Sequence, residues 1–343
     1  MKKRNVLQAF ALLGGLFAMG GTAQAQGNSL VMYCGVNEQW CRAAANAFQS
    51  ETGIRVDMTR QSAGEIYARL RAEKNNPRGD VWFGGTGDPH LQAAAEDLTE
   101  SYRSEALGQL RDWAKNQAER SQYRTVGLYM GALGYGYNET ELRRRNLTAP
   151  TCWSDLLKPE FKGEIQVADP NASGTSWTML ATLVQLMGEE PAFDYLKKLN
   201  VNVDQYTSAG AAPAQATARG ETMVGIAFQH DVIDAAKQNP NVRVVSPCEG
   251  TGYEIGSMSI VKGARHMEEA RRFYEWALTP AAQAIAPKHG SFQMPSNNAT
   301  PVPPEAPDVS RIKLINYDFE KYGSPAERSR LLQRWTREVK NAR

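Results

Sequence analysis

The chain has 343 residues, and its 39 Lys and Arg residues against 37 acidic ones give a formal net charge of +2. This length exceeds the usual size of a single hydrophobic core, so we expect two lobes. A nearly neutral chain has no extended positive field, which argues against nucleic acid or an anionic membrane surface as a partner.

The first 25 residues have the three-part pattern of a cleavable secretory signal. A positive start at residues 2–4 is followed by an apolar run over residues 6–19 and a small-x-small motif at residues 23–25. Because the run is shorter than the roughly 20 residues of a membrane-spanning helix, we expect cleavage after Ala25 and a periplasmic protein. Residues 1–25 hold three basic and no acidic residues, so the rest of the chain has a net charge of −1.

Strand-like and helix-like segments alternate along the rest of the chain, which favours an α/β fold with a largely parallel sheet. Ligands of such folds bind beyond the carboxyl ends of the strands. Ser62 followed by Glu65 fits a capping box at the start of a helix. In this part of the chain we expect strands over residues 29–33, 54–59 and 80–83, and helices over residues 40–52 and 62–74.

The middle of the chain carries the segments that we expect to build the second lobe. We interpret the glycine-spaced residues 126–138 as the first crossing between lobes and residues 242–261 as the return. Paired hinge strands let two lobes close over a ligand as rigid bodies. Between the crossings we expect strands over residues 164–168, 201–206 and 223–228, and helices over residues 177–187, 212–219 and 232–238, with a further helix that ends at residues 195–199. The predicted division is lobe 1 over residues 26–128 and 256–300, lobe 2 over residues 129–255, and a C-terminal helical segment, residues 301–343, packed on the lobes.

Four cysteines, Cys34, Cys41, Cys152 and Cys248, are an even number in an oxidising compartment, which predicts disulfides. Of the three possible pairings we favour Cys34 with Cys41, which closes a short loop, and Cys152 with Cys248. A metal site is the weaker alternative, because the close C-x-x-C pairs of zinc sites are absent from the sequence. We expect no cofactor.

Four short loops rich in Gly, Ser and Thr each lie where a helix is expected to begin. The first N–H groups of a helix are unpaired, small residues let a ligand approach, and the helix dipole favours an anion. For any one loop, an ordinary helix cap is the better interpretation, but four loops at the same end of two lobes favour an anion site. The lysine-bearing GxxxxGK[ST] motif is absent, so nucleotide hydrolysis is not indicated. The loops are residues 62–64, 85–86, 173–176 and 208–210.

Polar residues also follow the predicted strand 223–228, at the end where side chains point into the cleft of an α/β lobe. The acceptors Asp231 and Glu254 suit sugar hydroxyls, and His230 can donate to a hydroxyl or a phosphate oxygen. The alternative is that Asp231 only caps the next helix. The remaining histidines lack metal-site spacing and are expected at the surface: His90, His266 and His289.

Several stretches resemble the periplasmic substrate-binding proteins of ABC importers, in the cluster that includes ferric-iron-binding proteins. The resemblance covers essentially the whole chain after the signal and implies the type II periplasmic-binding-protein fold, with two α/β lobes, two hinge strands and a closing cleft. It also implies an inner-membrane ABC permease as partner, no catalysis and a monomer. The stretches are LVMYCG, SAGEIYARLRAEKNNPRGDVWFGG, ADPNASGTSW, YTSAGAAPAQATARGE, VGIAFQHD, EGTGYEIGSMSIVKGARH and the INYDF…W block.

The resemblance also implies a ligand set. The iron-binding branch has two adjacent tyrosines where this chain has His230 and Asp231, and the sequence holds no Tyr-Tyr pair, which argues against ferric iron. The branch that binds hexose phosphates carries a His-Asp pair there and a Glu that corresponds to Glu254. By resemblance, the sugar hydroxyls contact these three side chains. The phosphate then lies among Thr86, Ser173, Thr175, Ser208, Ala209 and Gly210.

We therefore expect a binding protein that captures a small phosphorylated solute, a sugar phosphate, and delivers it to a permease. A phosphonate such as 2-aminoethylphosphonate and ferric iron are the alternatives within the family, and a secreted phosphate-ester hydrolase is the alternative from another class. The sequence lacks the GxSxG elbow of many hydrolases. Gly35 and Val36 stand where relatives often have Ser or Thr, which leaves one hydroxyl fewer or a backbone contact only.

Overall fold

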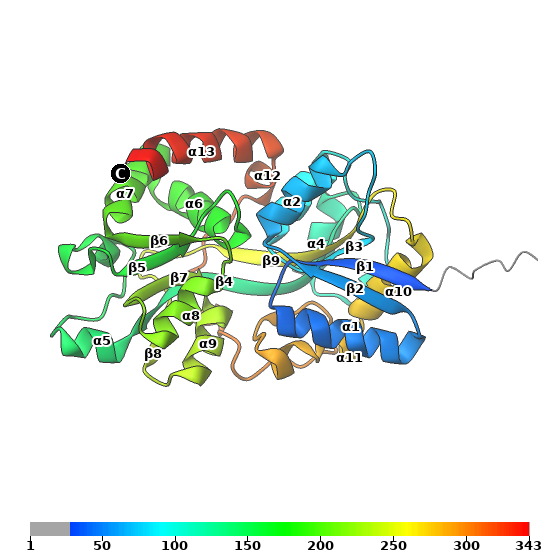
Figure 1. Cartoon of the computed structure of the whole chain (residues 1–343), viewed down its shortest axis with the longest axis horizontal. Coiled ribbons are helices and arrows are strands. Elements are labelled where there is room, and N and C mark those ends of the chain that lie inside the picture. Colours follow the sequence, from blue (N-terminus) through cyan, green and yellow to red (C-terminus); the bar gives the residue numbers. More distant parts are fainter. Residues whose placement is uncertain (1–27, 343) are drawn as a thin grey trace, which may run out of the picture.

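The computed structural model of the chain describes residues 28–342 (Figure 1). The predicted secretory signal at residues 1–25 lies outside the described residues. In the part of the chain that the structure describes, no helix combines the length and the apolar character needed to cross a membrane.

Ten strands of the described residues form one mixed sheet, in the order β2-β1-β3-β9-β4-β7-β5-β6, with β8 and β10 paired to β4. β1 is parallel to β2 and β3 at one end, and β5 is parallel to β6 and β7 at the other. The predicted parallel sheet is therefore found at the two ends, and the centre is antiparallel. The strands are β1 (Ser29–Cys34), β2 (Arg55–Arg60), β3 (Val81–Phe83), β4 (Val126–Asn138), β5 (Ile165–Ala168), β6 (Val203–Thr207), β7 (Val224–Phe228), β8 (Val242–Val245), β9 (Tyr253–Ile260) and β10 (Met294–Pro295).

Helices cover both faces of the sheet (Figure 1). They are α1 (Glu38–Thr52), α2 (Ala63–Ala72), α3 (Gly87–Ala95), α4 (Asp112–Arg120), α5 (Glu139–Arg144), α6 (Gly174–Met187), α7 (Glu189–Asn202), α8 (Ala212–Arg219), α9 (Gln229–Gln238), α10 (Met267–Ala277), α11 (Pro280–Gln283), α12 (Phe319–Tyr322) and α13 (Pro325–Glu338). Short 3₁₀ turns are η1 (Glu105–Gln109), η2 (Ser154–Leu157), η3 (Pro159–Phe161), η4 (Ala286–His289), η5 (Val309–Arg311) and η6 (Lys340–Ala342).

The alternation of side chains along β1 explains how the sheet is covered on both faces. Leu30 and Met32 pack into one buried cluster together with Phe48 of α1. Tyr33 points to the other face and packs with Ile66 of α2. Successive side chains of a strand point to opposite faces, so one buried strand holds helices on both sides.

β4 and β9 run side by side across the middle of the molecule (Figure 1). β4 coincides with the predicted first crossing: its residues 126–132 pair with β9, and its residues 133–137 pair with β7. The predicted return segment holds two strands. β8 pairs with the far end of β4, and β9 continues to pair with β3. The residue boundaries of the two lobes stay a prediction.

Several helices begin earlier than the apolar pattern predicted. α1 starts at Glu38 because the Asn37 side chain accepts hydrogen bonds from the backbone N–H groups of residues 39 and 40. α6 starts at Gly174, and α9 starts at Gln229, directly after β7. α7 includes Val201, which we had assigned to a strand. First turns are polar here, so hydrophobic periodicity does not detect them.

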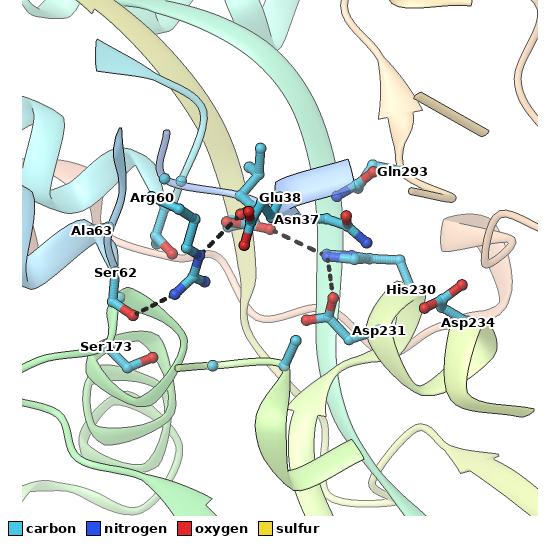
Figure 2. A pocket seen from close by; sticks show the side chains of 18 of the residues that line it. Asn37, Glu38, Arg60, Ser62, Ala63, Ser173, His230, Asp231, Asp234 and Gln293 are labelled. Atoms are coloured by element: carbon cyan, nitrogen blue, oxygen red, sulfur yellow. Dashed lines mark hydrogen bonds and ion pairs between the residues drawn. The ribbon is translucent and has the colours of Figure 1, made fainter. Parts of the chain in front are cut away.

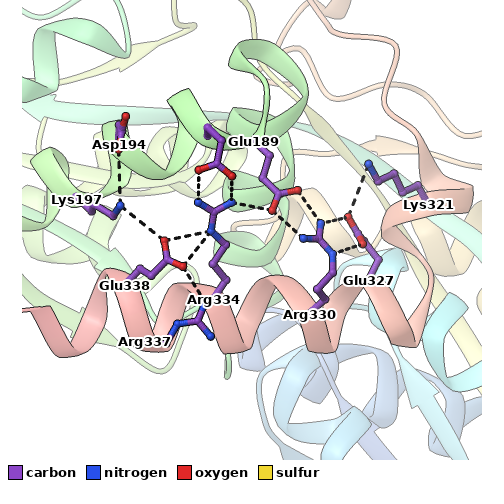
Figure 3. Close-up of polar contacts among 10 residues, drawn as sticks. Glu189, Asp194, Lys197, Lys321, Glu327, Arg330, Arg334, Arg337 and Glu338 are labelled. Atoms are coloured by element: carbon purple, nitrogen blue, oxygen red, sulfur yellow. Dashed lines mark hydrogen bonds and ion pairs between the residues drawn. The ribbon is translucent and has the colours of Figure 1, made fainter.

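The C-terminal helix α13 packs on α7, with Trp335 in the same buried cluster as Phe193. Figure 3 shows ion pairs along this contact: Arg334 lies 2.8 Å from Glu189 and 2.6 Å from Glu190, and Arg330 lies 2.7 Å from Glu189. A network of ion pairs around two guanidinium groups stabilises the position of a helix more than isolated surface ion pairs do. The end of the chain is thereby fixed to one end of the sheet.

Both favoured disulfides, Cys34–Cys41 and Cys152–Cys248, are present. The second joins residues 96 positions apart. Glu249 lies close to its two sulfurs, but cysteines in a disulfide offer no thiolate to a metal.

Candidate functional site

A cavity of about 670 Å³ lies between the two parallel groups of strands. Strands from both groups end at its wall, as expected for the carboxyl ends of parallel strands. Three of these strands come from each end of the sheet. The loops that follow them face each other because β4 and β9 hold the two parallel groups with their carboxyl ends toward each other. The lining residues at or just after β1, β2, β3, β5, β6 and β7 are Gly35, Arg60, Gly85, Ser173, Gly210 and His230.

The four predicted Gly, Ser and Thr loops come together at this cavity. Ser62, Thr86 and Ser173 are the N-cap residues of α2, α3 and α6, and all three line the cavity wall. The predicted capping box is present, since the Glu65 carboxylate accepts the backbone N–H of Ser62 at 2.8 Å. Several helix N-termini thus present unpaired N–H groups to one volume, which favours an anion there.

Most of the predicted site residues line the cavity, and the others lie in the same loops. The lining set includes Thr86, Ser173, Gly210, His230, Asp231 and Glu254. Thr175 packs against Gly210, where an added Cβ would lie 2.0 Å from its hydroxyl oxygen. The carbonyls of Ser208 and Ala209 accept hydrogen bonds from the hydroxyls of Ser62 and Thr207. A ligand-binding role for each of these residues stays a prediction.

The two halves of the site touch each other across the cavity. The Ser62 hydroxyl donates a hydrogen bond of 2.8 Å to the Ser208 carbonyl. A Cβ on Gly64 would lie 2.5 Å from the carbonyl oxygen of Ala172, and one on Gly174 would lie 2.5 Å from the Thr86 hydroxyl. Only glycine permits backbone approaches this close. The structure is therefore a closed arrangement of the two halves.

His230, Asp231 and Glu254 form a polar cluster at one end of the cavity, in which His230 and Glu254 are buried and Asp231 is partly buried. Figure 2 shows His230 beside Asp231. The His230 Nε2 atom lies 3.7 Å from Asp231 Oδ1 and 3.9 Å from Glu254 Oε1. Both distances are too long for direct hydrogen bonds, so the three groups are free to contact a molecule placed among them. α9 begins at Gln229, so Asp231 lies in the first turn of this helix and is not its N-cap, which is Phe228.

Burial sets the charges of this cluster. It lowers the pKa of His230 to about 3, so the imidazole is neutral. It raises the pKa of Asp231 to about 7, an effect that the positive Arg60 opposes. Burial and the neighbouring Asp231 raise the pKa of Glu254 well above its usual value, against a hydrogen bond from Thr86. The cluster therefore offers hydrogen-bonding groups with little full charge near neutral pH.

Arg60 is a cavity residue that the sequence did not reveal. It is the last residue of β2, and its guanidinium donates to the Val36 carbonyl at 3.3 Å and to the Ser62 hydroxyl at 3.5 Å (Figure 2). Within residues 28–342, no carboxylate forms an ion pair with it. The missed signal was its place at the carboxyl end of a strand, since the predicted strand stopped one residue earlier.

The expectation that His90 lies at the surface is wrong. Its side chain is fully buried, stacked on Trp82 at 3.6 Å, with Nδ1 2.7 Å from the Ser259 hydroxyl and Nε2 3.2 Å from the Gly84 carbonyl. These contacts fix the loop that leads to Thr86. His266 is half-buried and pairs with Asp80 at 2.9 Å.

The chain is similar to known solute-binding proteins over most of its length. A family model described as bacterial extracellular solute-binding protein matches residues 86–321. The periplasmic binding protein AfuA from Actinobacillus pleuropneumoniae, solved with exogenous fructose-6-phosphate bound, is 43% identical, with a TM-score of 0.89 over 92% of this chain and 99% of that one. This likeness confirms the predicted type II fold of two α/β lobes joined by two hinge strands.

Two more distant relatives are described with other ligands. A protein of Salmonella paratyphi A, provisionally named a 2-aminoethylphosphonate-binding periplasmic protein, is 30% identical over 72% of this chain and 71% of its own length. Iron-bound HitA from Pseudomonas aeruginosa is 19% identical, with a TM-score of 0.75 over 89% of this chain and 98% of that one, and this likeness shows the fold alone.

The raised pKa of Asp231 makes a prediction about stability. Between the usual carboxyl pKa of 3.8 and the folded value of about 7, the folded protein holds a proton that the unfolded chain lacks. The free energy of unfolding therefore falls as pH rises through this window, by up to about 1.4 kcal/mol per pH unit, and levels off above it. Denaturant unfolding of the ligand-free wild type and of Asp231→Asn, from pH 4 to 8, measures the difference. A difference that does not change with pH contradicts this assignment.

Proposed function

This chain belongs to the bacterial extracellular solute-binding protein family, and from that premise we propose that it captures a sugar phosphate in the periplasm and delivers it to an inner-membrane ABC permease. The observation that carries the proposal is the chemical difference between the two ends of the cavity. Figure 2 shows Arg60, Ser62 and Ser173 on one side and His230 with Asp231 on the other. One end suits an anion, and the other suits hydroxyl groups.

The first end holds the phosphate. The Arg60 guanidinium forms no ion pair with a carboxylate among the described residues, and α2, α3 and α6 begin at the same cavity, where first-turn N–H groups lack partners within their helices. Guanidinium and backbone N–H groups form charge-assisted hydrogen bonds with phosphate oxygens. Gly35 and Val36 supply no side-chain hydroxyl to the phosphate. Arg60 supplies hydrogen-bond donors instead, and its guanidinium donates a hydrogen bond to the Val36 carbonyl.

The second end holds the sugar. Neutral His230 offers one ring N–H or one acceptor, and the carboxyl groups of Asp231 and Glu254 accept or donate according to their protonation. A sugar hydroxyl both donates and accepts hydrogen bonds, so it needs a donor and an acceptor nearby. AfuA, at 43% identity, has been solved with fructose-6-phosphate bound, which supports the same ligand class for this chain.

A second candidate ligand is 2-aminoethylphosphonate, because the carboxyl groups of Asp231 and Glu254 could face its ammonium group and a relative bears its name. Burial disfavours the charged forms that an ammonium group needs, so we rank this ligand below a sugar phosphate. Ferric iron prefers hard oxygen ligands, and the tyrosine pair of the iron-binding branch is replaced by His230 and Asp231. We also propose that the protein is a monomer, requires no cofactor and leaves the ligand chemically unchanged.

Calorimetric titration with a ligand panel tests the proposal. Fructose 6-phosphate or glucose 6-phosphate is expected to bind with the highest affinity, 2-aminoethylphosphonate and inorganic phosphate more weakly, and fructose not at all. Mass spectrometry of the recovered ligand is expected to show it intact, which distinguishes a binding protein from a hydrolase. Tightest binding of the phosphonate, or release of free phosphate, would overturn the assignment.

The two ends predict two different mutational responses. Arg60→Ala is expected to weaken fructose 6-phosphate and inorganic phosphate alike, by about 10–100-fold, because it removes charge-assisted hydrogen bonds to the shared group. Glu254→Ala or His230→Ala is expected to weaken only the sugar phosphate, by about 1–3 kcal/mol. Arg55→Ala, on the exposed start of β2, is the matched control. If Glu254→Ala weakens inorganic phosphate equally, the two ends are wrongly assigned.

Closure makes a separate prediction. A side chain at Gly64 would collide with the backbone of residue 172 across the cavity. Gly64→Ala is therefore expected to hold the halves apart and to lower the affinity for every ligand by a similar factor, on the order of tenfold. Gly108→Ala is the control, since an added Cβ meets no atom within 4 Å there. Titrations on both variants measure the effect, and wild-type affinity in Gly64→Ala would rule out this role.

A further inference from the structure

The cavity continues beyond the cluster of His230, Asp231 and Glu254. One wall is a single face of α9, on which His230, Asp234 and Gln238 follow one another at helical spacing and all line the cavity. Gln238 comes eight positions after His230, which corresponds to about 12 Å along a helix. This wall is longer than one hexose ring. The proposed function places the first ring at the start of the wall, beside His230.

Gln293 also lines the cavity, from a segment that packs beside α9. It immediately precedes β10, whose Met294 pairs with Met130 of β4, while Glu254 of β9 pairs with the next residue, Gly131. Gln293 therefore lies on the other side of β4 from Glu254. Figure 2 shows Asp234 beyond His230, away from Arg60, and Gln293 above His230, near Asn37.

The Gln293 side chain is held in place but lacks a hydrogen-bond partner. It is 7% exposed, and its Oε1 atom is buried without any hydrogen bond. Phe292 lies under the ammonium group of Lys237 at 4.0 Å, and Gly290 lies against the Asp234 carboxylate, so the segment is fixed to α9. A buried acceptor without a donor costs free energy. Because Oε1 is enclosed by protein, the amide must rotate to bring this atom to a ligand hydroxyl in the cavity.

The outer part of the cavity is lined by amide, carboxylate and guanidinium groups. The lining residues include Asn37, Gln39 and Arg42 of the α1 region, together with Gln215, Asp234 and Gln238. An apolar group placed there would leave these polar atoms unpaired, whereas a hydroxyl-rich group satisfies them.

We propose that Gln293, Asp234 and Gln238 form an outer subsite for a second sugar unit, so that phosphorylated disaccharides are favoured over phosphorylated hexoses. This inference rests on the proposed function, which places the phosphate at Arg60 and the first sugar ring at His230, Asp231 and Glu254. The second ring is then attached at the end of the first ring that lies away from the phosphate.

Trehalose 6-phosphate and glucose 6-phosphate are matched probes, because they share the phosphorylated ring and differ by the second glucose. In calorimetric titrations, wild-type protein is expected to bind trehalose 6-phosphate about tenfold more tightly or better. Gln293→Ala is expected to remove this advantage and to leave glucose 6-phosphate binding within about twofold of wild type. Gln238→Ala, at an exposed position, tests the same subsite without any risk to folding. Gln333→Ala on α13 is the control and changes neither affinity.

The outcomes separate the subsite from the function on which it rests. Equal or weaker binding of trehalose 6-phosphate, with glucose 6-phosphate bound, overturns the outer subsite and leaves the proposed function standing. The same holds if Gln293→Ala and Gln238→Ala weaken both probes equally. Failure of every sugar phosphate to bind overturns both proposals.

Discussion

The antiparallel pairing of β4 with β9 is the constraint on which the site depends. Each strand pairs with its neighbour in the centre and with a parallel group at one end, so the two groups are held with their carboxyl ends toward each other. Helices that follow those strands begin at the same cavity, and their unpaired N–H groups converge there. An anion site is thus a consequence of topology before any charged side chain is considered. A break in either strand would separate the N-termini of α2 and α3 from those of α6 and α9.

The same burial that forms the cavity also divides it chemically. Desolvation keeps His230 neutral and raises the pKa values of Asp231 and Glu254, while a guanidinium retains its charge in any protein environment. Two ionised carboxylates beside a phosphate would repel it strongly in such a site. Partial neutralisation of the carboxyl groups and the charge of Arg60 let one cavity accept an anion at one end and hydroxyl groups at the other.

The sequence predicted those parts of the molecule that carry a periodic or spaced signal. The glycine-spaced pattern predicted the crossing strand β4, the even number of cysteines in an exported chain predicted the two disulfides, and a family motif predicted that His230, Asp231 and Glu254 share one site. Arg60 was missed because an arginine at the end of a half-exposed strand has the same pattern as a solvated charge. The surface assignment of His90 failed because its burial depends on Trp82 and Ser259, which come from other parts of the chain.

Gln293 shows why the extent of the cavity was beyond prediction. It lies in a segment without hydrophobic periodicity, and it reaches the site only because β10 pairs with β4 and Lys237 contacts the Phe292 ring.

Across the cavity, one hydrogen bond from Ser62 and close glycine contacts join the halves. A hydrogen bond contributes only about 1 kcal/mol net, so closure needs a further source of free energy. A ligand that bridges Arg60 and the cluster around His230 provides contacts to both halves at once, and one that also reaches Gln293 adds a partner for an atom that otherwise has none. Occupancy and closure are therefore coupled, since only the closed form makes all of these contacts.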